Sequence, residues 1–184
     1  MAITNDLIGR YVDLRSCNED DAEFTRAIRK DPEFVKYLPL IDNTIEEQKI
    51  WIRHQREKPG DYFFVVWDKN NNRIGTISIY DVNGKRAESG RLAIKGSNPF
   101  QAIEAQILSF RFAFDVLGLE CIDGYIYAEN DRAIRFNKQF AGKHFPAVID
   151  ENGRKIVKIE NWCDDFKKAD KRISSIIYRE KRSN

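Results

Sequence analysis

The sequence predicts an α/β fold of the α+β type, in which a mostly antiparallel central sheet is flanked by about four helices. Three observations lead to this prediction: two β-rich runs joined by turn-forming residues at 62–67 and 73–82, an amphipathic pattern that starts at Asn98, and strands that alternate with helices elsewhere. No internal repeat and no linker rich in Pro, Gly or Ser divides the chain. We therefore expect residues 1–184 to form a single domain.

A strand and two helices are predicted before the hairpin. Residues 11–15 alternate like a short strand, and Asn18 favours the start of a helix soon after it. A second helix is predicted from Thr44 to Lys58, because Thr44 and Glu47 have the spacing of a capping box, in which each side chain accepts from the other residue's backbone N–H. The Pro-Gly pair that follows should end this helix.

The best-marked helix follows a third antiparallel strand, which is predicted at 86–95. Asn98 can cap this helix, and Pro99 suits its first position because the missing N–H would have no partner there. Gly118 is suited to end it. The apolar residues that recur at helical spacing between these limits are Ile103, Ile107, Phe110, Phe114 and Leu117.

The last third of the chain predicts a strand, a helix, a second hairpin and a further helix. These lie at 121–128, 130–140, 144–150 with 155–160, and 162–171. The apolar segment 173–178 fits either a helix or a strand. It could form a homodimer interface, and a strand buried within one molecule would explain its composition equally well.

Composition and charge exclude several classes of protein. Lys and Arg number 31 against 29 Asp and Glu, so the net charge of +2 gives no field that would by itself attract nucleic acid. No apolar run approaches the ~20 residues of a membrane span, and the N-terminus lacks the pattern of a signal peptide. The three cysteines are far apart with no CxxC pair, so we expect no bound metal, and reduced thiols in a cytoplasmic protein.

The order of these elements resembles the fold of the GNAT superfamily, the acetyl-CoA-dependent N-acetyltransferases. The segment 87–93, Ala-Glu-Ser-Gly-Arg-Leu-Ala, resembles the fourth strand of the branch that contains the ribosomal-protein N-terminal acetyltransferases. The segment 74–77, Ile-Gly-Thr-Ile, and the pair Arg135-Phe136 are similar to a branch associated with bacterial surface-polysaccharide genes. The resemblance implies a GNAT fold whose sheet is split between its fourth and fifth strands.

The resemblance also implies that coenzyme A binds beside this split. In the family, the pantetheine arm pairs with main chain at the end of the fourth strand, and the pyrophosphate rests on amides at the start of the following helix. Such amides form an anion site because they lack partners within the helix and the helix dipole adds partial positive charge. The residues that would take these roles here are Leu92, Ala93, Ile94, Asn98, Phe100, Gln101 and Ala102. Asn130, at the start of the helix predicted at 130–140, would hydrogen-bond the pantetheine arm or the substrate.

The sequence departs from the family at the phosphate-binding loop. The usual motif, Gln/Arg-x-x-Gly-x-Gly/Ala, falls on residues 97–102, where only Ala102 keeps a matching small side chain. Phe100 stands in place of a glycine that lets the backbone approach a phosphate closely. The departure implies a reshaped loop, a weaker grip on the pyrophosphate, or loss of the cofactor.

Glu88 is the candidate general base, because the resembling branch has a carboxylate there and an attacking amine must lose a proton. The alternative is a solvent-facing glutamate on an exposed strand. Asp81 and Glu129 could substitute for it or bind a cationic amine. Many family members have a tyrosine as general acid where this chain has Asn137, which can donate a hydrogen bond to the departing thiolate but cannot protonate it. Water or another side chain would then supply the proton.

Two functions therefore fit the sequence. The first is an N-acetyltransferase that moves an acetyl group from acetyl-CoA to a primary amine on a small molecule or peptide, such as an amino-sugar nucleotide or a protein N-terminus, without a covalent enzyme intermediate. The second is a non-catalytic GNAT-like binding module that has lost the phosphate-binding loop. Binding of acetyl-CoA would distinguish the two.

Overall fold

The computed structural model describes residues 5–39 and 41–179, and it confirms the predicted α/β class. The helical elements are η1 (Glu19–Asp21), α1 (Ala22–Lys30), α2 (Ile45–Glu57), α3 (Pro99–Arg111), η2 (Phe112–Val116), α4 (Asp131–Lys138) and α5 (Cys163–Ile177). The strands are β1 (Leu7–Ile8), β2 (Val12–Ser16), β3 (Tyr62–Asp68), β4 (Arg73–Asn83), β5 (Arg86–Ile94), β6 (Cys121–Tyr127), β7 (Lys143–His144), β8 (Val148–Ile149) and β9 (Lys155–Trp162).

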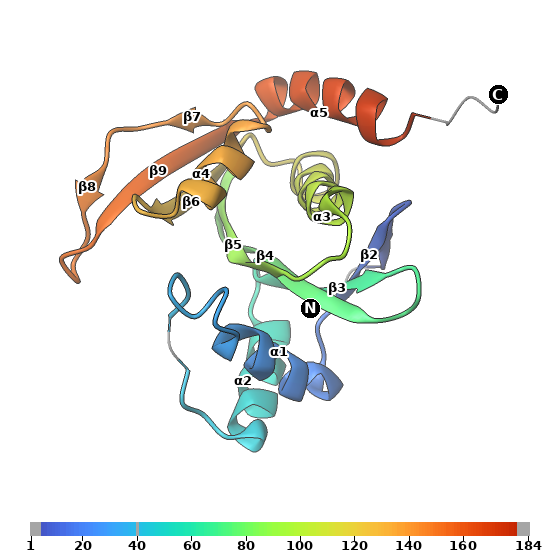
Figure 1. The fold of residues 1–184 in the computed structure, drawn as a ribbon, viewed down its shortest axis with the longest axis vertical. Coiled ribbons are helices and arrows are strands. Elements are labelled where there is room, and N and C mark those ends of the chain that lie inside the picture. The colour runs from blue at the N-terminus through green and yellow to red at the C-terminus, as the bar shows by residue number, and fades with distance from the viewer. Residues whose placement is uncertain (1–4, 40, 180–184) are drawn as a thin grey trace.

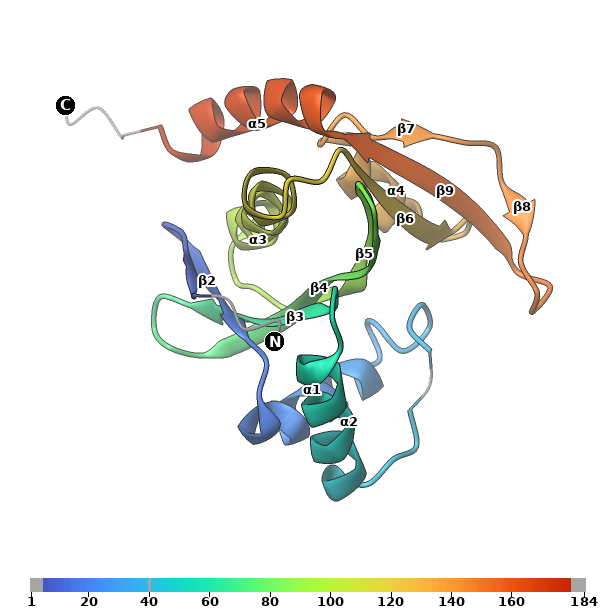
Figure 2. The same ribbon diagram turned by 180° about the vertical axis from the view of Figure 1, so that it is seen from behind.

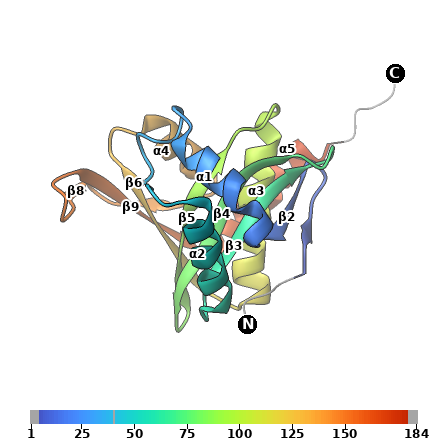
Figure 3. The ribbon, with the colours of Figure 1, turned by 90° about the horizontal axis from the view of Figure 1, so that it is seen from below.

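The strands form one curved sheet in the order β1-β2-β3-β4-β5-β6-β9-β7, with β8 also paired to β9. Every pairing is antiparallel except the one between β5 and β6. The helices α1 and α2 cover one face of the sheet, and α3 lies on the other face, inside its curve (Figure 1 and, from behind, Figure 2). Seen from below, α1 and α2 lie across β3 to β5, while β8 and β9 extend away from them (Figure 3).

Local signals set the helix starts as predicted. Thr44 Oγ1 accepts from the Glu47 amide at 3.2 Å, and the Glu47 carboxylate accepts from the Thr44 amide at 2.7 Å, which completes the capping box of α2. Asn98 caps α3, with Pro99 in the first turn. Helix α3 continues into the π-helical turn η2, and Gly118 follows it with a φ of 66°, a conformation that glycine adopts without strain.

The main hydrophobic core lies between α3, α5 and the sheet. Its largest fully buried members come from α3, α5, two strands and the segment that follows α4: Phe110, Phe140, Phe166, Ile79, Ile107 and Ile122. Ile173 and Ile177 of α5 add to this core and are 5 % and 2 % exposed. Residues 173–177 belong to α5 (Cys163–Ile177), so the alternative of a strand in this segment is wrong.

The second predicted hairpin is only partly correct. The two short strands β7 and β8 each pair with β9, whereas the sequence predicted one continuous strand at 144–150. Pro146 lies in the break between them, where a residue without an N–H cannot extend the ladder. The short strand β1, which pairs with β2, was not predicted.

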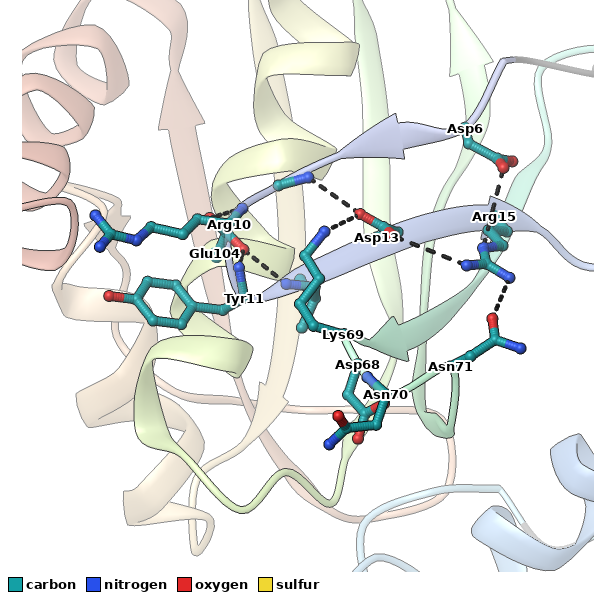
Figure 4. A network of polar contacts seen from close by, with 12 residues as sticks. Asp6, Arg10, Tyr11, Asp13, Arg15, Asp68, Lys69, Asn70, Asn71 and Glu104 are labelled. Atoms are coloured by element: carbon teal, nitrogen blue, oxygen red, sulfur yellow. Dashed lines mark hydrogen bonds and ion pairs between the residues drawn. The ribbon is translucent and has the colours of Figure 1, made fainter.

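A buried carboxylate of α3 holds the turn between β1 and β2. Glu104 is completely buried, and its two oxygens accept from the backbone amides of Arg10 at 2.8 Å, Tyr11 at 2.6 Å and Val12 at 2.8 Å (Figure 4). The neighbouring Asp13 accepts from Lys69 at 2.5 Å, so charged side chains tie this turn to the β3–β4 connection as well. The anchor explains β1, because a two-residue strand has no stability of its own.

The sheet splits where the resemblance implies. Strands β5 and β6 pair in parallel only at their beginnings, the last pair being Glu88 with Asp123, and no described strand pairs with β5 on that side beyond Glu88. The pairing of β5 with β4 shifts register near Arg91, whose φ of 50° marks a bulge. Ala87 and Leu92 both pack toward α3, although strict alternation would place them on opposite faces, so the bulge reverses the faces of β5 at the split.

Candidate active site

Two cavities meet at the split between β5 and β6. The split cavity, of about 390 Å³, is lined by Tyr80, Glu88, Gln106, Asn137 and Asn161 among others. The α4 cavity, of about 610 Å³, lies between the end of β5, the start of α3 and α4. The residues that line both cavities are Phe34, Tyr37, Leu92, Asn130 and Ala133, so the two form one continuous cleft.

The split cavity passes from one face of the sheet to the other. Glu88 and its cross-strand partner Tyr80 lie on the face that carries α1 and α2, since the adjacent Ala87 packs toward α3. Gln106 and Asn161 line the same cavity from the α3 side. A ligand that enters from either face can therefore reach the same point in the split.

Glu88 is half-buried on the wall of this cavity rather than fully exposed on its strand. Burial raises the pKa of its carboxyl, and the carboxylates of Asp81 and Asp123 raise it further, whereas the Tyr80 hydroxyl and Lys158 oppose the shift. Burial likewise raises the pKa of Tyr80 to about 12. A carboxyl with a raised pKa is a stronger base once ionised, which suits it to accept a proton.

Arg91 fixes the bulge from the side of α2. Its guanidinium donates to both oxygens of Asp61, at 2.7 and 3.0 Å, and the Asp61 side chain is fully buried. The rings of Trp51, Phe63 and Tyr80 surround the guanidinium carbon at 5.3, 5.5 and 4.6 Å. These contacts hold a left-handed backbone that a residue with a Cβ adopts only at some cost.

The start of α3 is closed by its own cap. The Phe100 amide donates to Asn98 Oδ1 at 2.9 Å, and the Gln101 amide donates to the Asn98 carbonyl at 3.0 Å. The Gln101 side chain in turn accepts from the Asn98 amide at 3.1 Å. Two of the three amides expected at the phosphate site, those of Phe100 and Gln101, therefore already have partners within the protein. The third residue, Ala102, lines the α4 cavity.

The other predicted cofactor residues divide between cleft and core. Leu92 and Ile94 line the α4 cavity, whereas the Ala93 side chain is 1 % exposed and points away from it. Asn130 lines both cavities and also caps α4, accepting from the Ala133 amide at 3.1 Å. Asn137 lines the split cavity and donates to the Ala133 carbonyl at 2.9 Å.

The two substitute carboxylates lie farther out. Asp81 is exposed and pairs with Lys58 at 2.9 Å, and it lines neither cavity. Glu129 lines the α4 cavity and pairs with Arg154 at 2.6 Å, which lowers its pKa. Residues 5–39 and 41–179 place no group of three or more His, Cys, Asp or Glu side chains where they could hold a metal ion.

Several residues of the cleft were not predicted from the sequence. Tyr125 and Tyr127 line the split cavity, and their spacing in β6 puts both on the face that carries Glu88. Gln106 interrupts the apolar stripe of α3, which is a signal that could have revealed it. The pairing of Arg91 with Asp61 joins distant segments and has no local signal.

The comparison with protein families now identifies the class. The model of the acetyltransferase (GNAT) domain family matches residues 12–140, so the chain belongs to the GNAT acetyltransferase family. The comparison with curated proteins finds no relative. Among the described residues, no helix combines the length and the apolar character needed to cross a bilayer.

Solved structures show the same fold. FdhC, described as a nucleotide-linked sugar GNAT, has a TM-score of 0.77 at 21 % identity, over 96 % of this chain and 97 % of that one. A GCN5-related N-acetyltransferase from Brucella melitensis has a TM-score of 0.75 at 19 % identity, over 91 % and 82 %. The spermidine N-acetyltransferase from Vibrio cholerae, in complex with CoA and spermine, has a TM-score of 0.77 at 16 % identity, over 85 % and 98 %.

Proposed function

We propose that this chain transfers an acetyl group from acetyl-CoA to a primary amine, with Glu88 as the general base. One observation carries the proposal: Glu88 is a half-buried carboxylate with a raised pKa on the wall of a cavity that passes through the split of a GNAT sheet. A solvated surface glutamate would have neither the cavity nor the shift in pKa.

The donor side of the cleft supports acetyl-CoA as the acyl donor. Beyond Glu88 the β6-facing edge of β5 has no strand partner among the described residues, so main chain near Leu92 and Ile94 is available to an extended pantetheine arm. The α4 cavity continues from this edge to Ala102 at the start of α3. A phosphate there would meet the positive end of the helix dipole, although the cap at Asn98 leaves fewer free amides than the family motif provides.

The residues of the split cavity account for the proton transfer. Acetyl-CoA supplies a thioester whose C–S bond breaks as the amine nitrogen forms the new C–N bond. Glu88 accepts the proton that the amine loses, and its raised pKa favours that role. Asn137 lines the same cavity and keeps one amide hydrogen that it would donate toward the departing sulfur, while water in the cleft would protonate the thiolate.

The acceptor side favours an amine attached to a ring. Four tyrosines, Tyr37, Tyr80, Tyr125 and Tyr127, line the split cavity, and aromatic faces pack well against sugar rings and nucleobases. This supports an amino-sugar nucleotide as the acceptor, with a peptide N-terminus as the second acceptor to test. The described similarity to a nucleotide-linked sugar GNAT agrees with the first choice.

Calorimetric titration with acetyl-CoA, followed by assays with amino-sugar nucleotides, peptides and polyamines, tests the proposal. We expect heat of binding, a rise in melting temperature and acetylation of at least one amine. If saturating acetyl-CoA produces neither heat nor a thermal shift, the chain is a non-catalytic GNAT-like binding module. The capped start of α3 is the observation that favours this second function.

A further inference from the structure

Three carboxamide side chains line the part of the split cavity that lies on the α3 side of the sheet: Gln106 from α3, Asn137 from α4 and Asn161 from β9. Gln106 is 2 % exposed and Asn161 is 3 % exposed. The wall next to them is Phe110, which is 1 % exposed. A cluster of amides at the edge of an apolar core needs an explanation, because buried polar groups are normally hydrogen-bonded.

The protein satisfies Gln106 poorly. Within the described part of the chain its side chain makes one hydrogen bond, from Nε2 to Ser109 Oγ at a long 3.5 Å. Ser109 Oγ already donates to the Gln106 main-chain carbonyl at 3.0 Å, so the hydroxyl serves mainly to bond the backbone. The buried Gln106 carboxamide thus keeps acceptor and donor capacity on the cavity wall.

Asn161 is also weakly bonded. Its Nδ2 donates to the Ile122 carbonyl at 3.5 Å, and its Oδ1 has no partner among the described residues. Asn137 differs, since its Nδ2 has a good bond to the Ala133 carbonyl. Asn161 Oδ1 is enclosed beside Gly142, so the groups that a ligand can reach are the Gln106 carboxamide and Asn161 Nδ2. Both are weakly bonded and belong to the floor of one cavity, which suits a ligand that carries hydrogen-bonding groups of its own.

The position of this floor assigns it to the acyl donor. The α4 cavity, where the pantetheine arm is proposed to lie, joins the split cavity at Leu92, Asn130 and Ala133, and Phe34 and Tyr37 from the segment after α1 complete the junction. Since the α4 cavity is bounded by the start of α3 and by α4, a pantetheine arm in it reaches the split from the side that carries Gln106. Glu88, Tyr125 and Tyr127 lie on the opposite face, which leaves that side of the split to the amine acceptor. An acyl group at the split therefore lies between the carboxamides on the α3 side of the sheet and Glu88 on the face that carries α1 and α2.

The charges around the cavity favour a neutral acyl group. The charged residues of its lining are Glu88, Arg91 and Asp150, and the guanidinium of Arg91 is already paired with Asp61. An acyl group that ends in a carboxylate would meet Glu88 without a free cation to offset the repulsion. A purely aliphatic chain would remove water from Gln106 and give it no hydrogen bond in return.

We infer that the carboxamide floor, Gln106 with Asn161 and Asn137, is an acyl-binding pocket that favours a neutral hydroxylated acyl group, longer than acetyl, over an aliphatic one of equal length. The inference rests on the proposed function, because it requires an acyl-CoA in the cleft. Acetyl-CoA fits the same space and leaves the carboxamides bonded to water. The reaction is otherwise the same: the C–S bond breaks, the C–N bond forms, and Glu88 takes the proton of the amine.

The test compares 3-hydroxybutyryl-CoA with butyryl-CoA, which differ by one hydroxyl, in calorimetric titrations of the wild-type protein. We expect the hydroxylated thioester to bind about 3- to 10-fold more tightly, the range of one neutral hydrogen bond. The substitution Gln106→Met keeps the length of the side chain and removes its polar atoms, and it should bring the ratio of the two dissociation constants close to one. No acceptor is needed for this measurement.

A matched control is Gln48→Met. Gln48 is 4 % exposed on α2, donates to Thr25 Oγ1 at 3.0 Å and lines neither cavity, so its loss should reduce stability and leave the ratio at the wild-type value. Equal affinity of the wild type for the two thioesters overturns the inference, and so does a ratio that survives Gln106→Met. If Gln106→Met does not fold, the wild-type ratio decides. If no acyl-CoA binds at all, the proposed function fails instead, and the two failures are thereby distinguished.

Discussion

Glu104 and Glu88 are two carboxylates of one molecule that lie in opposite situations. Glu104 is completely buried, and three backbone amides donate to it within 2.8 Å. Glu88 is half-buried, lines a cavity, and has a pKa that burial and nearby carboxylates raise. The protein satisfies the first charge with its own backbone and leaves the second charge poorly compensated.

The difference indicates where a ligand is needed. A carboxylate that accepts several amides stabilises the fold and has little left to offer a substrate. A carboxylate held in a partly dehydrated site is costly to ionise and gains from taking up a proton. We therefore expect the region around Glu104 to determine stability and the region around Glu88 to determine activity, and the predictions below test this division.

The largest effect should come from Glu88→Gln. Glutamine keeps the size and hydrogen-bonding capacity of the side chain but cannot accept a proton, so kcat should fall by ~10²–10⁴, the usual contribution of a general base. The dissociation constant for acetyl-CoA should stay the same, because Glu88 lies outside the α4 cavity. The melting temperature should not fall, since the substitution removes a charge that burial disfavours.

The pH profile separates proton transfer from positioning. Only ionised Glu88 can accept a proton, so kcat/KM of the wild type should rise with pH through a pKa above the ordinary value for glutamate. That step should be absent from Glu88→Gln, and the difference between the two proteins should shrink at high pH, where more of the amine is already neutral. A variant within about twofold of the wild type at every pH removes Glu88 from the mechanism.

The converse substitution is Glu104→Gln. One oxygen becomes an NH₂ group that faces backbone N–H groups, so the free energy of unfolding should fall by about 3 kcal/mol through buried donors left without an acceptor. Urea denaturation measures this as a lower midpoint. Turnover per folded molecule should change little, because Glu104 lines neither cavity.

The control for Glu104 is Glu46→Gln, which removes an exposed carboxylate that pairs with Lys49. The midpoint of this variant should equal that of the wild type, since exposed ion pairs contribute little. If both variants unfold at the same urea concentration as the wild type, the three hydrogen bonds from backbone amides to Glu104 do not anchor the turn between β1 and β2.

The sequence predicted what local signals determine. Caps at Thr44 and Asn98 and the turn after β3 each lie within a few residues of the element they set, and the structure confirms them. Strand β1 could not be predicted, because Glu104 holds it from a helix far along the chain. The prediction of a single strand at 144–150 was wrong, because Pro146 is enough to interrupt so short a ladder.

The candidate site divides in the same way. Resemblance to a family placed Glu88, Leu92 and Asn130, and the structure gathers all three around the split. The left-handed backbone of Arg91 depends on its buried pairing with Asp61, which joins β5 to the segment before β3 and leaves no trace in local sequence. Roles assigned to these residues stay predictions until the variants are measured.

A smaller effect is expected at the phosphate end of the cleft, from Ala102→Glu. The substitution places a negative charge and bulk where the α4 cavity meets the start of α3, so the dissociation constant for acetyl-CoA should rise about tenfold. Calorimetry measures it directly. Ala102→Gln adds similar bulk without charge and should weaken binding less; equal affinity of all three proteins would place the pyrophosphate elsewhere.

The smallest effect concerns Asn98, whose side chain occupies the Phe100 amide. Asn98→Gly should lower the free energy of unfolding by only a few tenths of a kcal/mol, because glycine is an adequate N-cap. It also releases the Phe100 amide, so acetyl-CoA should bind as tightly as in the wild type or about threefold more tightly if a phosphate accepts from that amide. Asn98→Asp keeps the cap oxygen but adds a negative charge, and it should weaken binding. Weaker binding by Asn98→Gly together with unchanged binding by Asn98→Asp would contradict the view that the cap competes with a phosphate, and would assign Asn98 itself to the ligand.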